Sequence, residues 1–230
     1  MDPARLSRIA RLTGGLLLLM AVVAIFAQVG VRGTLVVPGD AAQTADLIGA
    51  QTGFFRLGLM GFLTAFLLDV PVAVLLHELL KPVNRLGSSL ALAFRLVYTA
   101  VVAAALMPWL AALILLEDGS WSAFEPAQIH QMVLFCMELF DRGFTLALMF
   151  FGLHLALLGP LLFRSGRVPR ALGVLVGLGG LAYVADSVAA VVAPDLRPML
   201  LPVVATLGMA ELLLALWLVV RGWAAPRTGV

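Results

Sequence analysis

The feature that most constrains the fold of this chain is a set of six long apolar runs, separated by short segments rich in Pro, Gly and charged residues. Each run reaches the roughly 18–20 residues needed to cross the hydrocarbon of a bilayer. The runs are continuous rather than alternating, which favours transmembrane helices over a β-barrel. We predict spans at residues 12–31, 53–79, 88–116, 129–163, 171–193 and 199–220. The expected fold class is therefore all-α, an integral membrane bundle of six transmembrane helices that forms a single domain over residues 1–230.

Composition agrees with this interpretation. The chain is 62% hydrophobic and 12% charged, whereas soluble proteins are roughly 45–50% apolar and about 25% charged. The basic residues before the first run give it some likeness to a signal peptide. No clear small-x-small cleavage site follows, so we expect this run to remain as an uncleaved span.

Basic residues are distributed unequally between the two sets of connecting segments. Because positive residues are enriched on the cytoplasmic side, we predict that both termini are cytoplasmic. The net charge is only +2, so the chain as a whole is not strongly basic and its basic residues are merely distributed unevenly between the two sides. This gives no indication of nucleic-acid binding. Only Arg32 and Arg197 fall on the predicted outer side, and the predicted inner side holds Arg5, Arg8, Arg11, Lys81, Arg85, Arg164, Arg167, Arg170, Arg221 and Arg227.

Ionisable residues inside the predicted spans are the candidate functional residues. A charge at the centre of a bilayer costs about 2.5–3.5 kcal/mol, so these side chains are expected to face inward and to be paired. Two interpretations stay open, a polar cavity that binds a ligand or relays protons, and a set of buried salt bridges that fixes helix register. The candidates are Arg56, Asp69, Arg95, Glu138, Asp141, Arg142, Asp186 and Glu211.

Depths counted from the start of each span divide these candidates into two layers. The predicted outer layer holds Arg56, Glu138, Asp141, Arg142 and Asp186, and the predicted inner layer holds Asp69, Arg95 and Glu211. Glu138, Asp141 and Arg142 can pair along one helix face and reach Arg56 or Asp186. Arg95 is expected to pair with Asp69 or Glu211. The predicted cytoplasmic end holds His77, Glu78 and His154.

Small and breaker residues predict how the helices pack. The glycines of the fourth span (Gly143, Gly152, Gly159) and the fifth (Gly173, Gly177, Gly180) have spacings that allow close helix approach. Pro71, Pro108 and Pro160 are expected to kink or end regular helix. In the long loop after the first span, Asp40 could cap a short helix, and a plain solvated loop is the alternative.

The motifs of common enzyme classes are missing from the sequence. It contains no P-loop, HExxH, paired CxxC or GxSxG pattern, and its single lysine, Lys81, lies in a connecting turn, so a retinal Schiff base in a span is excluded. We therefore lean against an enzyme and expect no cofactor. His77 and His154 could ligate a haem as an axial pair, but satisfied or interfacial histidines are far more common.

Several segments together resemble a known bacterial multi-pass membrane family, domain of unknown function 4386. They are FRLGL from Phe55, Asp69, LLKPVNRLGSSLALAFRLV from Leu79, MFFGLHLALLGPLLFRSGRVPRALGVLVGLGGLAYVADS from Met149, and ELLLALWLVVRG from Glu211. The resemblance implies a bacterial inner-membrane protein and assigns no activity. The predicted function is binding or transport of a small polar or ionic ligand in a charged core. The alternative is a structural or regulatory membrane protein that acts through partner helices.

Overall fold

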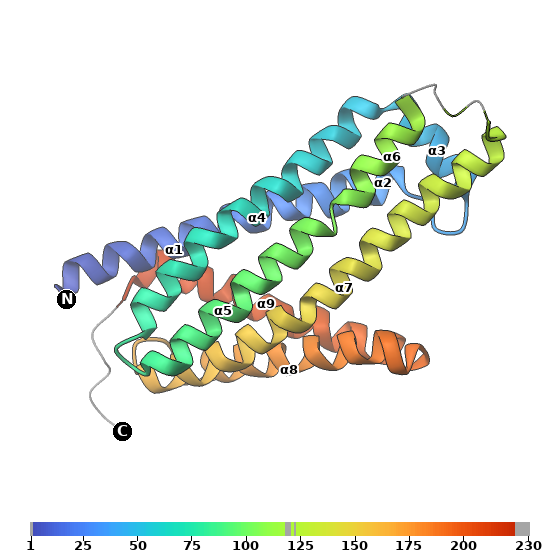
Figure 1. Cartoon of the computed structure of the whole chain (residues 1–230). Helices are drawn as coiled ribbons and strands as arrows, with labels where there is room; N and C mark the ends of the chain where they lie inside the picture. The colour runs from blue at the N-terminus through green and yellow to red at the C-terminus, as the bar shows by residue number, and fades with distance from the viewer. Residues whose placement is uncertain (1, 118–120, 122, 224–230) are drawn as a thin grey trace. The chain divides into compact units, whose positions relative to one another are not determined.

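The computed structural model describes residues 2–117, 121 and 123–223, and the regular structure within them is helical throughout (Figure 1). Arg227, one of the basic residues in the orientation argument, lies outside the described residues. The α-helices are α1 (Pro3–Ile25), α2 (Gly33–Leu35), α3 (Ala41–Ala50), α4 (Thr52–Leu80), α5 (Arg85–Ala104), α6 (Met107–Glu117), α7 (Pro126–Ser165), α8 (Arg170–Val192) and α9 (Arg197–Arg221). A π-helical stretch, Phe26–Arg32, joins α1 to α2, and a 3-10 turn, Pro194–Leu196, precedes α9.

Six helical stretches of the described chain are long and apolar enough to cross a membrane, which confirms the predicted all-α fold class. They are Ala4–Leu35, Thr52–Leu80, Arg85–Glu117, Pro126–Ser165, Arg170–Val192 and Pro194–Arg221. Five of the six predicted spans lie within these stretches, and the fifth span extends one residue beyond its stretch. The first stretch begins eight residues before the predicted span, because the basic residues from Arg5 to Arg11 continue the helix instead of preceding it.

The predicted helix breakers act in two ways. Pro71 lies inside α4 and Pro160 inside α7, and both helices continue through them. The third span is interrupted, since α5 ends at Ala104 and α6 starts at Met107 with Pro108 as its second residue. Proline is tolerated there because the first helical turn has no intrahelical partner for its N–H groups.

The short helix after the first span is present as α3, and its cap is the predicted one. The Asp40 side chain accepts a hydrogen bond from the Gln43 backbone N–H at 2.9 Å. This bond satisfies one of the donors that a helix N-terminus leaves unpaired. The loop alternative is therefore wrong for residues 41–50.

The chain divides into two compact units. Unit 1 comprises Met1–Met20, Leu68–Ala100 and Thr145–Val230. Unit 2 comprises Ala21–Leu67 and Val101–Phe144.

Unit 1 contains the predicted close approach of glycine-bearing helices. A methyl group on Gly159 of α7 would come within 2.5 Å of the Gly177 backbone, and one on Gly152 within 2.6 Å of the Gly180 carbonyl oxygen, both on α8. No side chain separates the two backbones at these positions, as is usual where small residues line a helix interface in a membrane. Helix α8 then packs along α9, its neighbour in the chain (Figure 1).

Unit 2 has an aromatic core. The Phe55 and Trp109 rings stack with their centroids 4.4 Å apart, and Phe62 and Phe140 pack against Trp109 at 5.5 and 5.6 Å. All four side chains are almost completely buried. Aromatic pairs at these separations stabilise a fold beyond the area that they bury.

Candidate functional site

Segments of four helices within unit 1 bring ionisable side chains together around Arg95 of α5. The guanidinium donates to Oδ1 of Asp69 on α4 from both Nε (2.9 Å) and Nη2 (2.6 Å). Its Nη1 donates to Oε1 of Glu211 on α9 at 3.0 Å and to Nε2 of His154 on α7 at 3.1 Å. We call Arg95, Asp69, His154, Glu211 and the neighbouring Thr99 the Arg95 cluster.

The two carboxylates of the cluster differ in accessibility. The Arg95 side chain is 0% exposed and that of Asp69 is 2% exposed, whereas Glu211 keeps 18% of its side-chain surface accessible. The hydroxyl of Thr99 donates to the second oxygen of Asp69, so both oxygens of that carboxylate are engaged. Asp69 is therefore locked in place, and Glu211 forms the accessible edge of the cluster.

Hydrogen bonding fixes the protonation of His154. Its Nε2 faces an Arg95 nitrogen, which can only donate, and its Nδ1 lies 2.8 Å from the Ala91 carbonyl oxygen, which can only accept. One ring nitrogen must therefore accept and the other must donate, which defines the neutral Nδ1–H tautomer. With His154 neutral, the cluster contains one positive charge and two carboxylates.

Aromatic side chains close one side of the cluster. The Arg95 guanidinium carbon lies 5.4 Å from the centroid of the Phe151 ring, a cation–π distance. Tyr98 and Tyr183 pack on the same ring, with centroids 4.8 and 5.7 Å away. These rings exclude water from the guanidinium and lower the local dielectric, which strengthens its ion pairs.

The cluster residues share one level along their helices. Asp69, Arg95, His154 and Glu211 each lie ten to twelve residues from a basic residue at or next to one end of their helix. These basic residues are Lys81, Arg85, Arg164 and Arg221. At 1.5 Å per residue the offset is about 15–18 Å. That is roughly half of a 30 Å hydrocarbon core.

His154 is where the depth estimate from the sequence was wrong. Counted from the start of the fourth span, it was expected at the cytoplasmic end, together with His77. Helix α7, however, has 40 residues, about twice the number that crosses hydrocarbon, so counting from that end overshoots. Counting from the basic end of each helix would have placed His154 level with Arg95.

Among the predicted outer-layer residues, Asp186 lies in unit 1, where it pairs with Arg197. The Asp186 oxygens accept from Nε (3.1 Å) and Nη2 (3.2 Å) of Arg197, which closes the α8–α9 hairpin. Asp186 is buried. The predicted contact between Asp186 and the outer-layer residues of the fourth span was wrong. Asp186 pairs with Arg197 instead, because the short turn between α8 and α9 brings Arg197 back over the end of α8.

The remaining predicted residues belong to unit 2 and are dispersed. Arg56 pairs with Glu117 at 2.7 Å, and Asp141 pairs with Arg32 at the end of the π-helical stretch. Arg56, Glu138 and Arg142 are exposed, so the expectation that every ionisable residue faces inward was wrong for these three. Helix α7 is much longer than a bilayer is thick, so a charge within its apolar sequence need not be buried in protein.

Four partners went unnoticed in the sequence. Thr99 lies one helical turn after Arg95, a spacing that places both on one face and could have indicated it. Arg32, Glu117 and Arg197 were assigned to connecting segments, and no sequence pattern singled them out as partners.

The two histidines of the haem hypothesis have separate partners. Nδ1 of His77 lies 2.9 Å from the Ser88 hydroxyl, and both ring nitrogens of His154 are used by Arg95 and Ala91. His154 has no nitrogen left for a metal in this arrangement. The described residues contain no group of three or more His, Cys, Asp or Glu side chains that could hold a metal ion.

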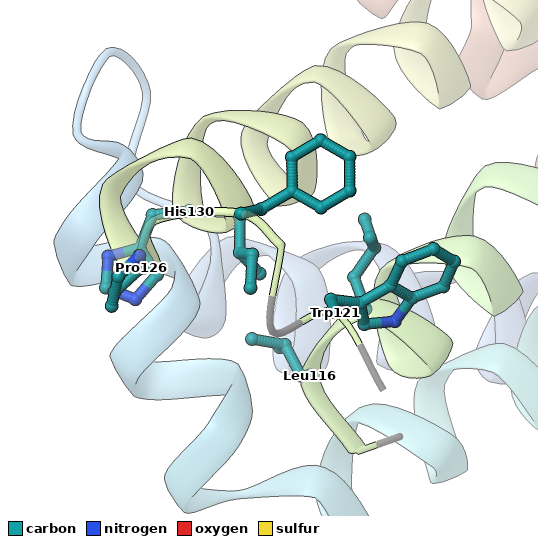
Figure 2. Close-up of a pocket in the computed structure, with 7 residues that line it drawn as sticks. Leu116, Trp121, Pro126 and His130 are labelled. Carbon is teal, nitrogen blue, oxygen red and sulfur yellow. The ribbon is translucent and has the colours of Figure 1, made fainter. Parts of the chain in front are cut away.

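Unit 2 has an open, mostly apolar pocket of about 330 Å³ beside the start of α7. Trp121 lies at one side of it, and Pro126 and His130 lie at the opposite side (Figure 2). The Trp121 indole N–H donates to the Ile114 carbonyl at 3.3 Å. In the part of the chain that the structure describes, no carboxylate, arginine or lysine side chain lines this pocket, so it is a weaker candidate than the Arg95 cluster for binding an ionic ligand.

Comparison with known proteins supports the family but assigns no activity. The model of the family described as Domain of unknown function (DUF4386) matches residues 12–222. An uncharacterised protein of the archaeon Archaeoglobus fulgidus is 33% identical over 168 residues, which cover 71% of this chain and 83% of that protein. No solved structure matches.

Proposed function

The chain belongs to the DUF4386 family, and we propose that it is a multi-pass membrane protein that exchanges a proton at the Arg95 cluster. The proposal rests on one observation, which is that a single buried guanidinium faces two carboxylates, Asp69 and Glu211. The sequence predicted a charged core that binds a small ionic ligand, and the proposal identifies that ligand as a proton.

The net charge of the Arg95 cluster is the reason to expect proton exchange. With both carboxylates ionised and His154 neutral, the cluster carries one net negative charge in a buried, partly aromatic environment. An uncompensated charge there is costly, and a proton on one carboxylate removes it. Glu211 is the group that can exchange, because Asp69 is held by Arg95 and Thr99 and is almost fully buried.

Placement in the membrane supports the same proposal. The level of the cluster, about 15–18 Å from the basic helix ends, corresponds to the middle of a bilayer if those ends lie at the head groups. We propose that this basic end of unit 1 is cytoplasmic, in a bacterial inner membrane, with both termini on that side and the whole chain forming one transmembrane domain.

Infrared difference spectroscopy of the purified protein, stepped between acidic and alkaline buffer, tests the proposal. We expect a protonated-carboxyl band that changes with pH in the wild type and disappears in Glu211→Gln. The matched control is Glu78→Gln, because Glu78 is a glutamate at the end of α4 that pairs with Lys81 outside the cluster. A band that persists in Glu211→Gln would overturn the assignment to Glu211. A repeat with added sodium separates a proton site from a cation site, since a cation site would lose the band as sodium rises.

A structural role for the cluster is the second candidate, and close packing favours it. All three guanidinium nitrogens of Arg95 and both ring nitrogens of His154 have partners. Such a network can fix helix register without binding anything. It predicts that Glu211→Gln alters stability but leaves pH-driven proton uptake into liposomes unchanged, whereas the exchange proposal predicts that uptake falls.

A further inference from the structure

A groove of about 450 Å³ lies between α7 and α8 of unit 1. Gly159 and Pro160 of α7 and Gly177 and Leu178 of α8 form part of its walls, and Phe163 and Arg164 lie at one end. Pro160 and Leu178 are exposed. Both helices are long and apolar enough to cross a membrane, so an exposed groove between them faces lipid.

The groove exists because the two backbones approach each other at glycines. A methyl group added at Gly159 would meet the Gly177 backbone at 2.5 Å, so no side chain from either position extends over the contact. Larger apolar side chains, among them Leu178 and Leu181, also line the groove. The result is an open, mostly apolar groove, and apolar surface of this kind suits a hydrocarbon chain.

The groove ends at a concentration of positive charge. Arg164 lines it directly, and the guanidinium of Arg170 lies 5.6 Å from the centroid of the Phe163 ring. Within the described part of the chain, neither Arg164 nor Arg170 forms an ion pair with a carboxylate. The turn between α7 and α8 contains no acidic residue. These two guanidinium groups are therefore available to an external anion, and guanidinium binds phosphate well.

We propose that this groove is a binding site for an anionic phospholipid, with the head-group phosphate on Arg164 and Arg170 and one acyl chain along Gly177 toward Leu181. The length fits, because Leu181 lies eleven residues after Arg170, about 17 Å along α8. One leaflet of hydrocarbon is roughly 15 Å deep. The site is separate from the Arg95 cluster and does not depend on the proton proposal.

Native mass spectrometry of the full chain, released from nanodiscs of mixed phosphatidylglycerol and phosphatidylcholine, tests the site. We expect the wild type to retain phosphatidylglycerol and the double variant Arg164→Gln/Arg170→Gln to retain less, by about fivefold for each arginine removed. The matched control is Arg85→Gln/Arg221→Gln, which removes the same charge from two other exposed helix ends of unit 1. Equal loss in both double variants would show nonspecific attraction to the basic surface and overturn the proposal.

A second variant tests the acyl-chain part. At Gly177 an added methyl meets its nearest neighbours only at 3.7–3.8 Å, which is ordinary contact, so Gly177→Ala should fold normally and keep the lipid. Gly177→Leu places a larger side chain in the groove and should reduce retention of phosphatidylglycerol. Retention equal to wild type in a folded Gly177→Leu protein would overturn the acyl-chain assignment. Competition by inorganic phosphate alone would identify an anion site that needs no lipid, and would likewise contradict the proposal.

Discussion

Nη1 of Arg95 lies 3.0 Å from Oε1 of Glu211, although 116 residues of sequence separate these two side chains. The contact joins α5 to α9 and gives Arg95 its second carboxylate. Since Asp69 comes from α4 and His154 from α7, the cluster forms only when all four helices are in register. Substitutions within it should therefore report on the assembly of unit 1.

Replacing Arg95 should be the most damaging of these changes. Arg95→Met leaves two carboxylates without their cation, and we expect the free energy of unfolding to fall by about 3–5 kcal/mol, as when one partner of a buried ion pair is removed. Arg95→Lys keeps the charge but cannot bond Asp69 through two nitrogens, so it should recover only part of the loss. Unfolding in mixed detergent micelles measures both. If Arg95→Lys restored the full free energy of unfolding, the positive charge alone would stabilise the cluster, and the two-nitrogen contact of the guanidinium with Asp69 would not be needed.

His154 should contribute through its hydrogen bonds. His154→Leu removes the acceptor that faces Nη1 of Arg95, and we expect the free energy of unfolding to fall by about 1–3 kcal/mol, the usual penalty for a buried group that loses a partner. The control is His130→Leu in unit 2, where the side chain is only half-buried and little change is expected. If the two substitutions have equal effects, the bond to Arg95 contributes nothing measurable.

The glycines between α7 and α8 should differ sharply in tolerance. Gly159→Ala places a methyl group 2.5 Å from the Gly177 backbone, and overpacking of this kind costs about 1–3 kcal/mol. Gly177→Ala meets only ordinary contacts, and a helical Gly→Ala change there should be neutral or stabilising by up to about 1 kcal/mol. Thermal denaturation of the two variants side by side measures the difference. If Gly177→Ala were less stable than Gly159→Ala, α7 and α8 would separate more readily than their packing indicates.

The cap of α3 should act locally. Asp40→Ala removes the acceptor of the Gln43 N–H, and loss of such a cap costs about 1 kcal/mol. Asp46→Ala, an exposed change in the same helix, is the control. Hydrogen exchange should show faster exchange at the start of α3 in Asp40→Ala alone. Unchanged protection there would mean that packing of α3, and not its cap, holds the helix.

Local features were predictable because they depend on neighbours in the sequence. Continuous apolar runs indicated the spans, since backbone groups in lipid must be satisfied within the helix. The cap at Asp40 and the close approach at Gly159 and Gly177 also follow from short-range spacing. Their confirmation in the structure reflects rules that operate within one helix or between two adjacent ones.

Ion pairs between residues that are far apart in the sequence were harder to predict. Arg95 was expected to choose between Asp69 and Glu211, and the structure gives it both. His154 was placed at the wrong depth because α7 is much longer than a bilayer is thick. Glu138 and Arg142 are exposed. Hydropathy could not predict this, because the apolar character of a helix does not indicate which of its faces packs against another helix.

The sequence by itself therefore determined the class of this protein, a helical membrane protein of the DUF4386 family, because length and hydropathy suffice to define spans. Only the tertiary structure decided which charges meet. An ion pair requires side chains from different helices to share both depth and facing direction, and those depend on how helices slide and rotate against one another. In this chain that arrangement placed one arginine between two carboxylates, which is the basis of the proposed proton site.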